Sequence, residues 1–318
     1  MKAAVVTQFG PLPPVYAEFP DPTPAEGQHL IRVSAASISQ ITRSRASGTH
    51  YSAKAPLPLV AGVDGVGVRE DGRRVYFLMP APPYGAMAEY CVVRAEQCIE
   101  LPDELEDGAA AAMAIPGMSS WAALRERAQL RAGETVLING ATGISGQLAV
   151  QIAKHLGAGK VIATGRHPAT LNTLKSLGAD VVVSLAQEEA PLQAALRQAF
   201  EQGVDVVLDY LWGPSVQALI SAAVQSGPAG VPVRLVQIGA ASGASIELPG
   251  AALRSSPLQL MGSGIGSVPM PRLLAAIKNV LASAPTARLQ IATRNVPLAE
   301  VTQAWAMNDS RERIVLRP

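Results

Sequence analysis

The stretch that decides the fold is Glu134–Lys154, which reads ETVLINGATGISGQLAVQIAK. A short apolar run leads into the glycine-containing segment Asn139–Gly146, and an amphipathic segment follows it. Written as Ala141-x-Gly143-x-x-Gly146, the segment matches the dinucleotide fingerprint with alanine in its first position. The pattern therefore predicts a strand, a tight turn and a helix that together hold a pyrophosphate.

Each glycine of this turn has a physical reason. Gly143 has no Cβ, so the backbone can approach a phosphate closely, and Gly146 lets the helix pack tightly on the strand. The helix N-terminus offers free N–H groups and a positive dipole end. A turn that serves packing alone is the alternative, but the strand–turn–helix context favours nucleotide binding. We expect cofactor contacts from Asn139, Ala141, Thr142, Gly143, Ile144, Ser145 and Gly146.

The end of the second strand indicates which nucleotide binds. An NAD site usually has a carboxylate there to hold the ribose 2′-OH. Here the strand ends in Thr164-Gly165-Arg166-His167, without a carboxylate. A guanidinium suits a 2′-phosphate, so Arg166 favours NADP(H), unless it is simply a solvated loop residue. The expected contacts at this position are Gly165, Arg166 and His167.

The rest of the chain changes character near its middle. From Gly133 onward, Val-rich runs alternate with amphipathic segments, which predicts an α/β unit with a doubly wound parallel sheet. Before about residue 110, short β-type runs are punctuated by Pro and Gly, which predicts a barrel-like unit. Residues Ile291–Pro318 return to strand, helix and strand, and could form the last edge of that first unit.

Composition excludes several classes of protein. The 318 residues carry 26 Lys and Arg against 25 Asp and Glu, so no basic surplus exists to bind nucleic acid. No apolar run approaches the roughly 20 residues of a membrane-spanning helix. Two cysteines and four scattered histidines predict neither a disulfide framework nor a metal site. The N-terminus lacks a signal-peptide pattern, so we expect a cytoplasmic enzyme with a small-molecule substrate.

Several segments, in collinear order, resemble one family. They are Met1-Lys2-Ala3, Pro58–Gly67, Gly85–Tyr90, the nucleotide turn with Gln151-Ile152-Ala153-Lys154, Leu177–Asp180, Val204–Asp209 and Ile314-Val315-Leu316. Through them the chain resembles the medium-chain dehydrogenase/reductase superfamily, and within it the zinc-independent quinone oxidoreductases. The resemblance implies a discontinuous GroES-like domain of residues 1–112 and 285–318, a Rossmann domain of residues 113–284, and a homodimer.

The resemblance also bears on metal binding. Zinc alcohol dehydrogenases carry a catalytic Cys where this chain has Ser39, and a His where it has Val63. Zinc needs thiolate or imidazole ligands, so no metal is expected. The chain departs from the quinone-reductase pattern at Ser39-Gln40-Ile41-Thr42, where Asn-Pro-x-Asp is usual. It also has Ile144 in place of a second adjacent glycine, and Thr170 in place of a lysine.

The implied activity is hydride transfer from NADPH to a quinone or an α,β-unsaturated carbonyl compound. Enoyl-thioester reduction and NADPH binding without turnover are the alternatives. Tyr51 is the candidate proton donor, unless it only packs in its loop. Ser39 and Thr42 are expected to line the substrate site, unless they only cap a short helix. The resemblance extends the cofactor contacts to Ser119, Asp209, Tyr210, Ile238, Gly239, Ala240, Met261, Gly262 and Ser263.

Overall fold

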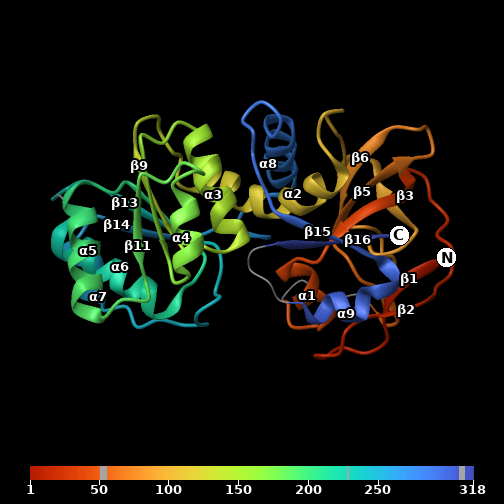
Figure 1. The fold of residues 1–318 in the computed structure, drawn as a ribbon, viewed down its shortest axis with the longest axis horizontal. Helices are drawn as coiled ribbons and strands as arrows, with labels where there is room; N and C mark the ends of the chain where they lie inside the picture. The colour runs from red at the N-terminus through yellow and green to blue at the C-terminus, as the bar shows by residue number, and fades with distance from the viewer. Residues whose placement is uncertain (51–55, 228, 308–311) are drawn as a thin grey trace. The chain divides into compact units, whose positions relative to one another are not determined.

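The computed structural model describes residues 1–50, 56–227, 229–307 and 312–318 of the chain. It divides into two compact units (Figure 1). The discontinuous unit comprises Met1–Ile115 and Leu281–Pro318, and the Rossmann unit comprises Pro116–Val280. Within the described residues, no helix is long and apolar enough to cross a membrane.

The Rossmann unit is built on a six-stranded sheet in the order β11-β10-β9-β12-β13-β14, and every neighbouring pair is parallel. Its strands are β9 (Thr135–Asn139), β10 (Lys160–Gly165), β11 (Val181–Ser184), β12 (Val206–Asp209), β13 (Val233–Gln237) and β14 (Leu258–Gly262). Its helices are α3 (Ile144–His155), α4 (Pro168–Leu174), α5 (Glu189–Glu201), α6 (Gly213–Ser226) and α7 (Gly250–Ser255), beside the π-helical Ala123–Arg127.

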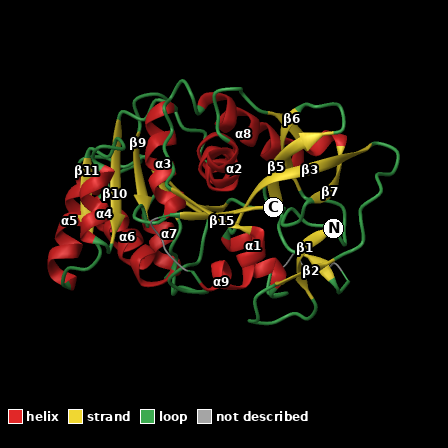
Figure 2. Cartoon of the chain, turned by 45° about the vertical axis from the view of Figure 1, so that its right-hand side comes forward, coloured by secondary structure: helices red, strands yellow, loops and turns green. Residues whose placement is uncertain are grey.

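Strand β9 lies in the middle of the sheet, and most of its side chains are fully buried. Val136, Leu137 and Ile138 are all 0% exposed, as expected for a parallel strand that carries helices on its faces. Figure 2 shows the helices of this unit running alongside its strands. The strand order reverses at β9, which pairs with β10 on one side and β12 on the other. Ligands of open α/β sheets bind at such a reversal, beyond the carboxyl ends of the strands.

The discontinuous unit contains two sheets. One has the order β15-β16-β3-β5-β6-β8, with β7 also paired to β3, and the other has the order β2-β1-β4. The strands are β1 (Lys2–Val6), β2 (Val15–Glu18), β3 (Gln28–Ser37), β4 (Leu59–Val60), β5 (Asp64–Arg69), β6 (Arg74–Leu78), β7 (Tyr90–Arg94), β8 (Cys98–Glu100), β15 (Thr293–Pro297) and β16 (Arg313–Arg317). The C-terminal β16 pairs antiparallel with β3, so the end of the chain completes the sheet that the N-terminal residues begin.

Helices supply the remaining elements. The discontinuous unit holds α1 (Gln40–Ala46), α9 (Val301–Ala306) and the 3-10 turns Ala95–Gln97 and Leu298–Glu300. Helices α2 (Asp107–Ala122) and α8 (Met270–Ser283) each run across a boundary between the units. Pro116 lies inside α2, although a proline usually ends or bends a helix.

A buried polar cluster lies inside the discontinuous unit. Asp64 is 0% exposed and accepts a hydrogen bond from the Tyr76 hydroxyl at 3.1 Å, while its other carboxyl oxygen has no hydrogen-bond partner among the described residues. Burial raises the pKa of Asp64 to about 7, against the opposing effects of the Tyr76 hydrogen bond and the Arg313 charge. The Arg313 guanidinium donates to the Ile38 carbonyl at 3.1 Å.

This cluster predicts a pH-dependent stability. The folded-state pKa of Asp64 lies above its ordinary value of 3.8, so this carboxyl ionises at a lower pH in the unfolded chain than in the folded one. The free energy of unfolding of the protein therefore falls as the pH rises toward 7. Asp64→Asn removes that loss. Between about pH 5 and about pH 8, its free energy of unfolding should therefore gain about 2–3 kcal/mol relative to the original protein, measured by urea unfolding. Asp103→Asn, at an exposed position, is the control, and equal shifts in all three proteins would contradict the assignment.

Candidate functional site

The turn between β9 and α3 has three glycines, and the structural setting of each one is different. Gly140 has a φ of +89°, which disfavours any side chain. A Cβ on Gly146 would lie 2.4 Å from the Gly140 carbonyl oxygen, so this glycine permits close packing of α3 on the turn. Gly143 has an ordinary φ of −77°, and an added Cβ would meet only the Gly140 carbonyl oxygen, at 3.7 Å. Neither backbone nor packing requires glycine there, and the space above it is open to a ligand.

Helix α3 starts at this open position without a protein cap. Gly143 is its N-cap residue, and no side chain accepts a hydrogen bond from the first turn. The first N–H groups of an α-helix have no partner within the helix, and they carry the positive end of its dipole. The turn therefore fits the pyrophosphate of a dinucleotide, which supplies negative oxygens to those N–H groups.

A buried hydrogen-bond network holds the turn from below. Asn139 is fully buried and donates to the Asp209 carboxylate at 2.8 Å and to the Ser215 hydroxyl at 3.0 Å. The Thr164 hydroxyl donates to the Asn139 side-chain oxygen at 2.7 Å, and the Thr164 carbonyl accepts from Ala141 N–H at 2.7 Å. The network thus ties the ends of β9, β10 and β12 to one another, just below the turn.

Asp209 closes this network. Its carboxylate accepts the N–H groups of Leu211 and Trp212, at 3.1 and 3.0 Å, in addition to the Asn139 amide. Burial raises its pKa, and these three hydrogen bonds oppose the rise. The predicted cofactor residues Asn139 and Asp209 therefore have side chains engaged within the protein. Their direct contact with a cofactor stays a prediction.

A pocket of about 670 Å³ lies beside the turn, at the strand ends. Arg166 follows β10, Leu185 follows β11 and Leu211 follows β12, and all three line it. Pro214, Ser215 and Ser242 also line it, together with residues of α5 and α6, the acidic Glu189 among them. The volume is typical of a small-molecule site, and its lining mixes leucine side chains with many polar ones. The exposed Arg166 guanidinium thus lies in the same pocket as the apolar Leu185 and Leu211 side chains, on which a flat base can pack.

The neighbouring residues of the second strand end play packing and capping roles. A Cβ on Gly165 would lie 2.3 Å from the Thr142 side chain, so Gly165 admits close contact with the turn. His167 is the N-cap of α4, and its Nδ1 accepts the N–H of Thr170 at 3.4 Å. A contact of His167 with a phosphate stays a prediction.

A second pocket, of about 460 Å³, lies at the ends of β13 and β14. It brings together three of the predicted residues, Ala240, Met261 and Gly262, beside Trp212 and Gln237. Two other predicted positions form the turns behind it. Ile238 N–H donates to the Asp209 carbonyl at 2.8 Å, and Ser263 N–H donates to the Gln237 carbonyl at 2.9 Å.

Tyr210 and Gly239 touch closely near this pocket. A Cβ on Gly239 would lie 2.7 Å from the Tyr210 carbonyl oxygen, so packing requires glycine there. The Tyr210 hydroxyl is buried and has no partner with good hydrogen-bond geometry among the described residues. Burial raises its pKa to about 12, opposed by the nearby Ser119 and Ser120 hydroxyls. Those serines donate instead to the carbonyls of Pro116 and Gly117, at 2.7 and 3.0 Å.

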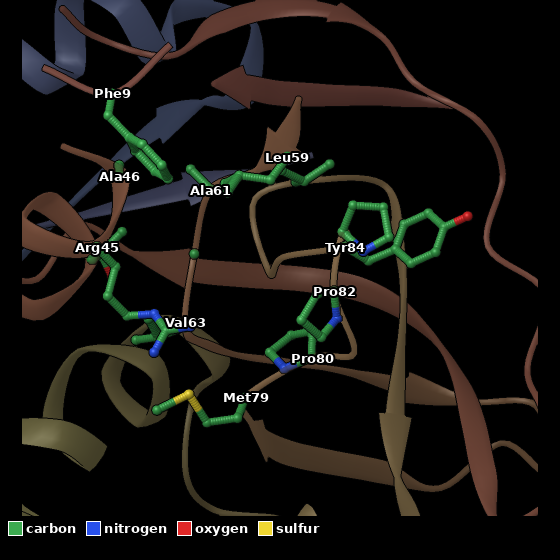
Figure 3. A pocket seen from close by; sticks show the side chains of 14 residues that line it. Phe9, Arg45, Ala46, Leu59, Ala61, Val63, Met79, Pro80, Pro82 and Tyr84 are labelled. Atoms are coloured by element: carbon green, nitrogen blue, oxygen red, sulfur yellow. The ribbon is translucent and has the colours of Figure 1, made fainter. Parts of the chain in front are cut away.

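The predicted catalytic residues belong to the discontinuous unit. Ser39 is the N-cap of α1 and accepts the Thr42 N–H at 3.2 Å, and the two buried hydroxyls lie 2.9 Å apart. Ser39 therefore does cap a helix, as the alternative interpretation expects. Thr42 also lines a pocket, and Figure 3 shows other residues of its lining, such as Arg45 and Val63. Tyr51 lies outside the described residues.

The positions that correspond to zinc ligands do not fit a zinc ion. Ser39 offers a hydroxyl that is already hydrogen-bonded, and Val63 offers only a buried aliphatic side chain. In the part of the chain that the structure describes, no group of three or more His, Cys, Asp or Glu side chains is placed to hold a metal.

The sequence did not predict several residues that line the 670 Å³ pocket. Leu185, Leu211 and Ser242 belong to no motif, yet each follows shortly after a strand of the sheet. Position directly after a predicted parallel strand is the signal that could have found the first two. The Thr164–Asn139–Asp209 network gave no signal, because its members are distant in sequence.

Comparison with known proteins adds independent information. The family model described as zinc-binding dehydrogenase matches residues 145–279. A probable NADPH-dependent quinone reductase, tdiC of Emericella nidulans, is 28% identical over the full length of both chains. A quinone oxidoreductase of Homo sapiens is 30% identical over 66% of each chain. The quinone oxidoreductase of Thermus thermophilus, whose structures include an NADPH complex, is 28% identical over the full length of both chains with a TM-score of 0.83.

The glycine geometry predicts opposite effects for two similar substitutions. Gly143→Ala should keep the thermal midpoint within about 2 °C, because its Cβ meets open space, but should weaken NADPH binding by about 10-fold or more through contact with the phosphates. Gly146→Ala should lower the free energy of unfolding by about 1–3 kcal/mol, because its Cβ overlaps the Gly140 carbonyl. Scanning calorimetry and calorimetric titration measure the two effects. An unfolded Gly143→Ala, or one with unchanged NADPH affinity, would contradict this interpretation.

Proposed function

Because the chain belongs to the medium-chain dehydrogenase/reductase superfamily, in its quinone oxidoreductase-like branch, we propose that it is a zinc-independent, NADPH-dependent reductase of quinones or α,β-unsaturated carbonyl compounds. The observation that carries the proposal is the open, uncapped turn at Gly143 beside a pocket with Arg166 at its wall. NADPH supplies a hydride when it is bound.

The Rossmann unit binds the cofactor. The α3 N-terminus takes the pyrophosphate, and the 670 Å³ pocket takes the adenosine half. Arg166 pairs with the 2′-phosphate, which is the function of its exposed guanidinium at the end of β10. The second pocket, with Ala240, Met261 and Gly262, lies toward the opposite end of the sheet and takes a more distant part of the cofactor.

The reduction adds one hydride and one proton to the acceptor and oxidises NADPH to NADP⁺. Catalysis requires a donor for the oxygen that gains negative charge. Ser39 accepts the Thr42 N–H and can donate its own proton to the Thr42 hydroxyl oxygen. Thr42 is then free to donate its proton into the pocket that it lines. Ser39 thus acts as a positioning residue, and Thr42 is the hydrogen-bond donor to the acceptor oxygen.

The side chains at the corresponding positions support zinc independence. A valine and a hydrogen-bonded serine cannot replace imidazole and thiolate ligands. Polarisation of the acceptor oxygen therefore depends on hydroxyl and backbone donors. This chemistry suits an acceptor whose carbonyl already activates a C=C bond.

Two further predictions concern the protein as a whole. The free thiols Cys91 and Cys98 support a reducing, cytoplasmic location. Strand β14 is one edge of the parallel sheet in the described structure, and such an edge can pair with the same strand of a second copy, which supports a homodimer. Light scattering at micromolar concentration checks the mass of the assembly.

The decisive activity test follows the reduced-nicotinamide absorbance. Chelator-treated protein receives NADPH or NADH together with quinones, enones, alkenals or enoyl thioesters. We expect turnover of quinones or enones with NADPH, at least about 10-fold above NADH in kcat/KM and unchanged by the chelator. Chelator-sensitive turnover would contradict zinc independence. Exclusive use of enoyl thioesters would select thioester reduction, and NADPH binding without any turnover would select a non-catalytic role.

A further inference from the structure

The pocket that Thr42 lines has a cavity of about 50 Å³, and this size limits which acceptor can reach the Thr42 hydroxyl. The volume is room for about four groups the size of a water molecule. The O=C–C=C unit of an enone has as many non-hydrogen atoms, and its alkyl chain leads away from this unit. A fused bicyclic quinone is too large, because its second ring is bonded directly to the carbonyl carbons and has to enter with them.

Apolar side chains make up most of the pocket lining that the structure describes. They come from Phe9, from α1, from the segment 59–63 and from the segment 79–84 that follows β6. Arg45 is the charged residue among the described lining residues, and it is already engaged within the protein. The carbon atoms beside the acceptor oxygen therefore meet mainly apolar walls.

Met79 has a backbone conformation that its local sequence does not favour. Its φ is +54°, in the left-handed region that residues with a Cβ rarely adopt. Pro80 follows it, and the residue before a proline is normally extended. The Met79 N–H donates to the Val63 carbonyl at 2.6 Å, which holds this conformation. The fold therefore imposes the position of Met79 against its local preference.

The imposed conformation presents the Met79 side chain to the pocket. Met79 and Val63 both line it, and Figure 3 shows the Met79 side chain extending toward Val63 and Arg45. Met79 is only half-buried, unlike the core residues of β6 that precede it. Residues held in such strained conformations cluster at binding and active sites. The thioether thus takes up space beside the position of the acceptor.

We propose that Met79 limits the size of the acceptor, and that this protein reduces open-chain enones or alkenals in preference to fused quinones. The inference rests on the proposed reductase function and narrows its substrate class. Met79 is then a specificity-determining residue, because its side chain restricts the cavity in which the Thr42 hydroxyl meets the acceptor oxygen.

The first test uses the original protein with two acceptors. One is trans-3-hexen-2-one, and the other is 1,4-naphthoquinone, which is larger but accepts a hydride more readily in solution. We expect kcat/KM with NADPH, measured without oxygen from the nicotinamide absorbance, to favour the hexenone by about 10-fold or more. Equal or better use of the naphthoquinone would overturn the size limit, even if no Met79 variant folds, while the reductase function would stand.

Variants locate the limit at Met79. Glycine adopts a positive φ freely, so Met79→Gly removes the side chain without adding backbone strain. It should raise kcat/KM for the naphthoquinone by about 10-fold or more and change that for the hexenone by less than about 3-fold. Met79→Leu has a similar volume and should keep the original ratio. An unchanged ratio in a folded Met79→Gly would overturn the proposal.

Arg288→Gly is the matched control. Arg288 has a φ of +51° and lies in the same unit, at an exposed position that is absent from the pocket lining. This variant makes the same backbone change at a different place, so it should keep the original ratio. An equal change of the ratio in Arg288→Gly would attribute the effect to the backbone and overturn the proposal. Circular dichroism confirms folding of each variant.

If neither acceptor is reduced, the reductase function fails for both classes, and binding decides the size limit. Calorimetric titration with each acceptor in the presence of NADP⁺, which has no hydride to transfer, then compares their affinities. Tighter binding of the hexenone by the original protein, with a gain for the naphthoquinone in Met79→Gly, supports the limit. Equal or absent binding overturns it.

Discussion

The close contact between Gly146 and the backbone of Gly140 and Ala141 is the constraint on which the cofactor site depends. A Cβ at Gly146 would lie 2.4 Å from the Gly140 oxygen and 2.5 Å from the Ala141 Cα. This contact holds the start of α3 against the end of β9. It directs the free N–H groups of the helix at the space above Gly143, where a Cβ would meet only the Gly140 oxygen, at 3.7 Å, among the described residues.

The buried network below the turn serves the same purpose. Asn139, Thr164 and Asp209 are each 0% exposed, and their hydrogen bonds tie three parallel strands together at the point where the strand order reverses. Buried polar groups are stabilising only when they are satisfied, so this network fixes one arrangement of the strand ends. The cofactor then meets a preformed surface.

Local patterns in the sequence predicted those parts of the site that depend on neighbouring residues. The turn Asn139–Gly146 and the position of Arg166 at the end of β10 follow from motif and spacing, and the structure places Arg166 at a pocket wall. Val-rich runs predicted the parallel strands because both faces of such strands are buried. Helices α2 and α8 were not foreseen: Pro116 obscured the first, and the second shares no motif with the wound pattern.

Features that depend on residues distant in sequence could not be predicted. The Asp64–Tyr76–Arg313 cluster joins β5, β6 and β16, and no periodicity relates these positions. The role of Ser39 was left between catalysis and helix capping, and the 3.2 Å hydrogen bond from Thr42 N–H shows the capping directly. The apolar side chains around Arg45 come from four separate segments, so only the fold reveals that this arginine lines a pocket.

As proposed above, the Rossmann unit holds a 2′-phosphorylated dinucleotide through Arg166. Calorimetric titration with adenosine 2′,5′-bisphosphate and with adenosine 5′-monophosphate tests it most directly, because neither ligand depends on the acceptor or on turnover. We expect the bisphosphate to bind at least about 10-fold more tightly. Arg166→Gln should remove this difference, and Arg197→Gln, at an exposed position of α5, should not. Equal affinity for the two nucleotides in the original protein would contradict it.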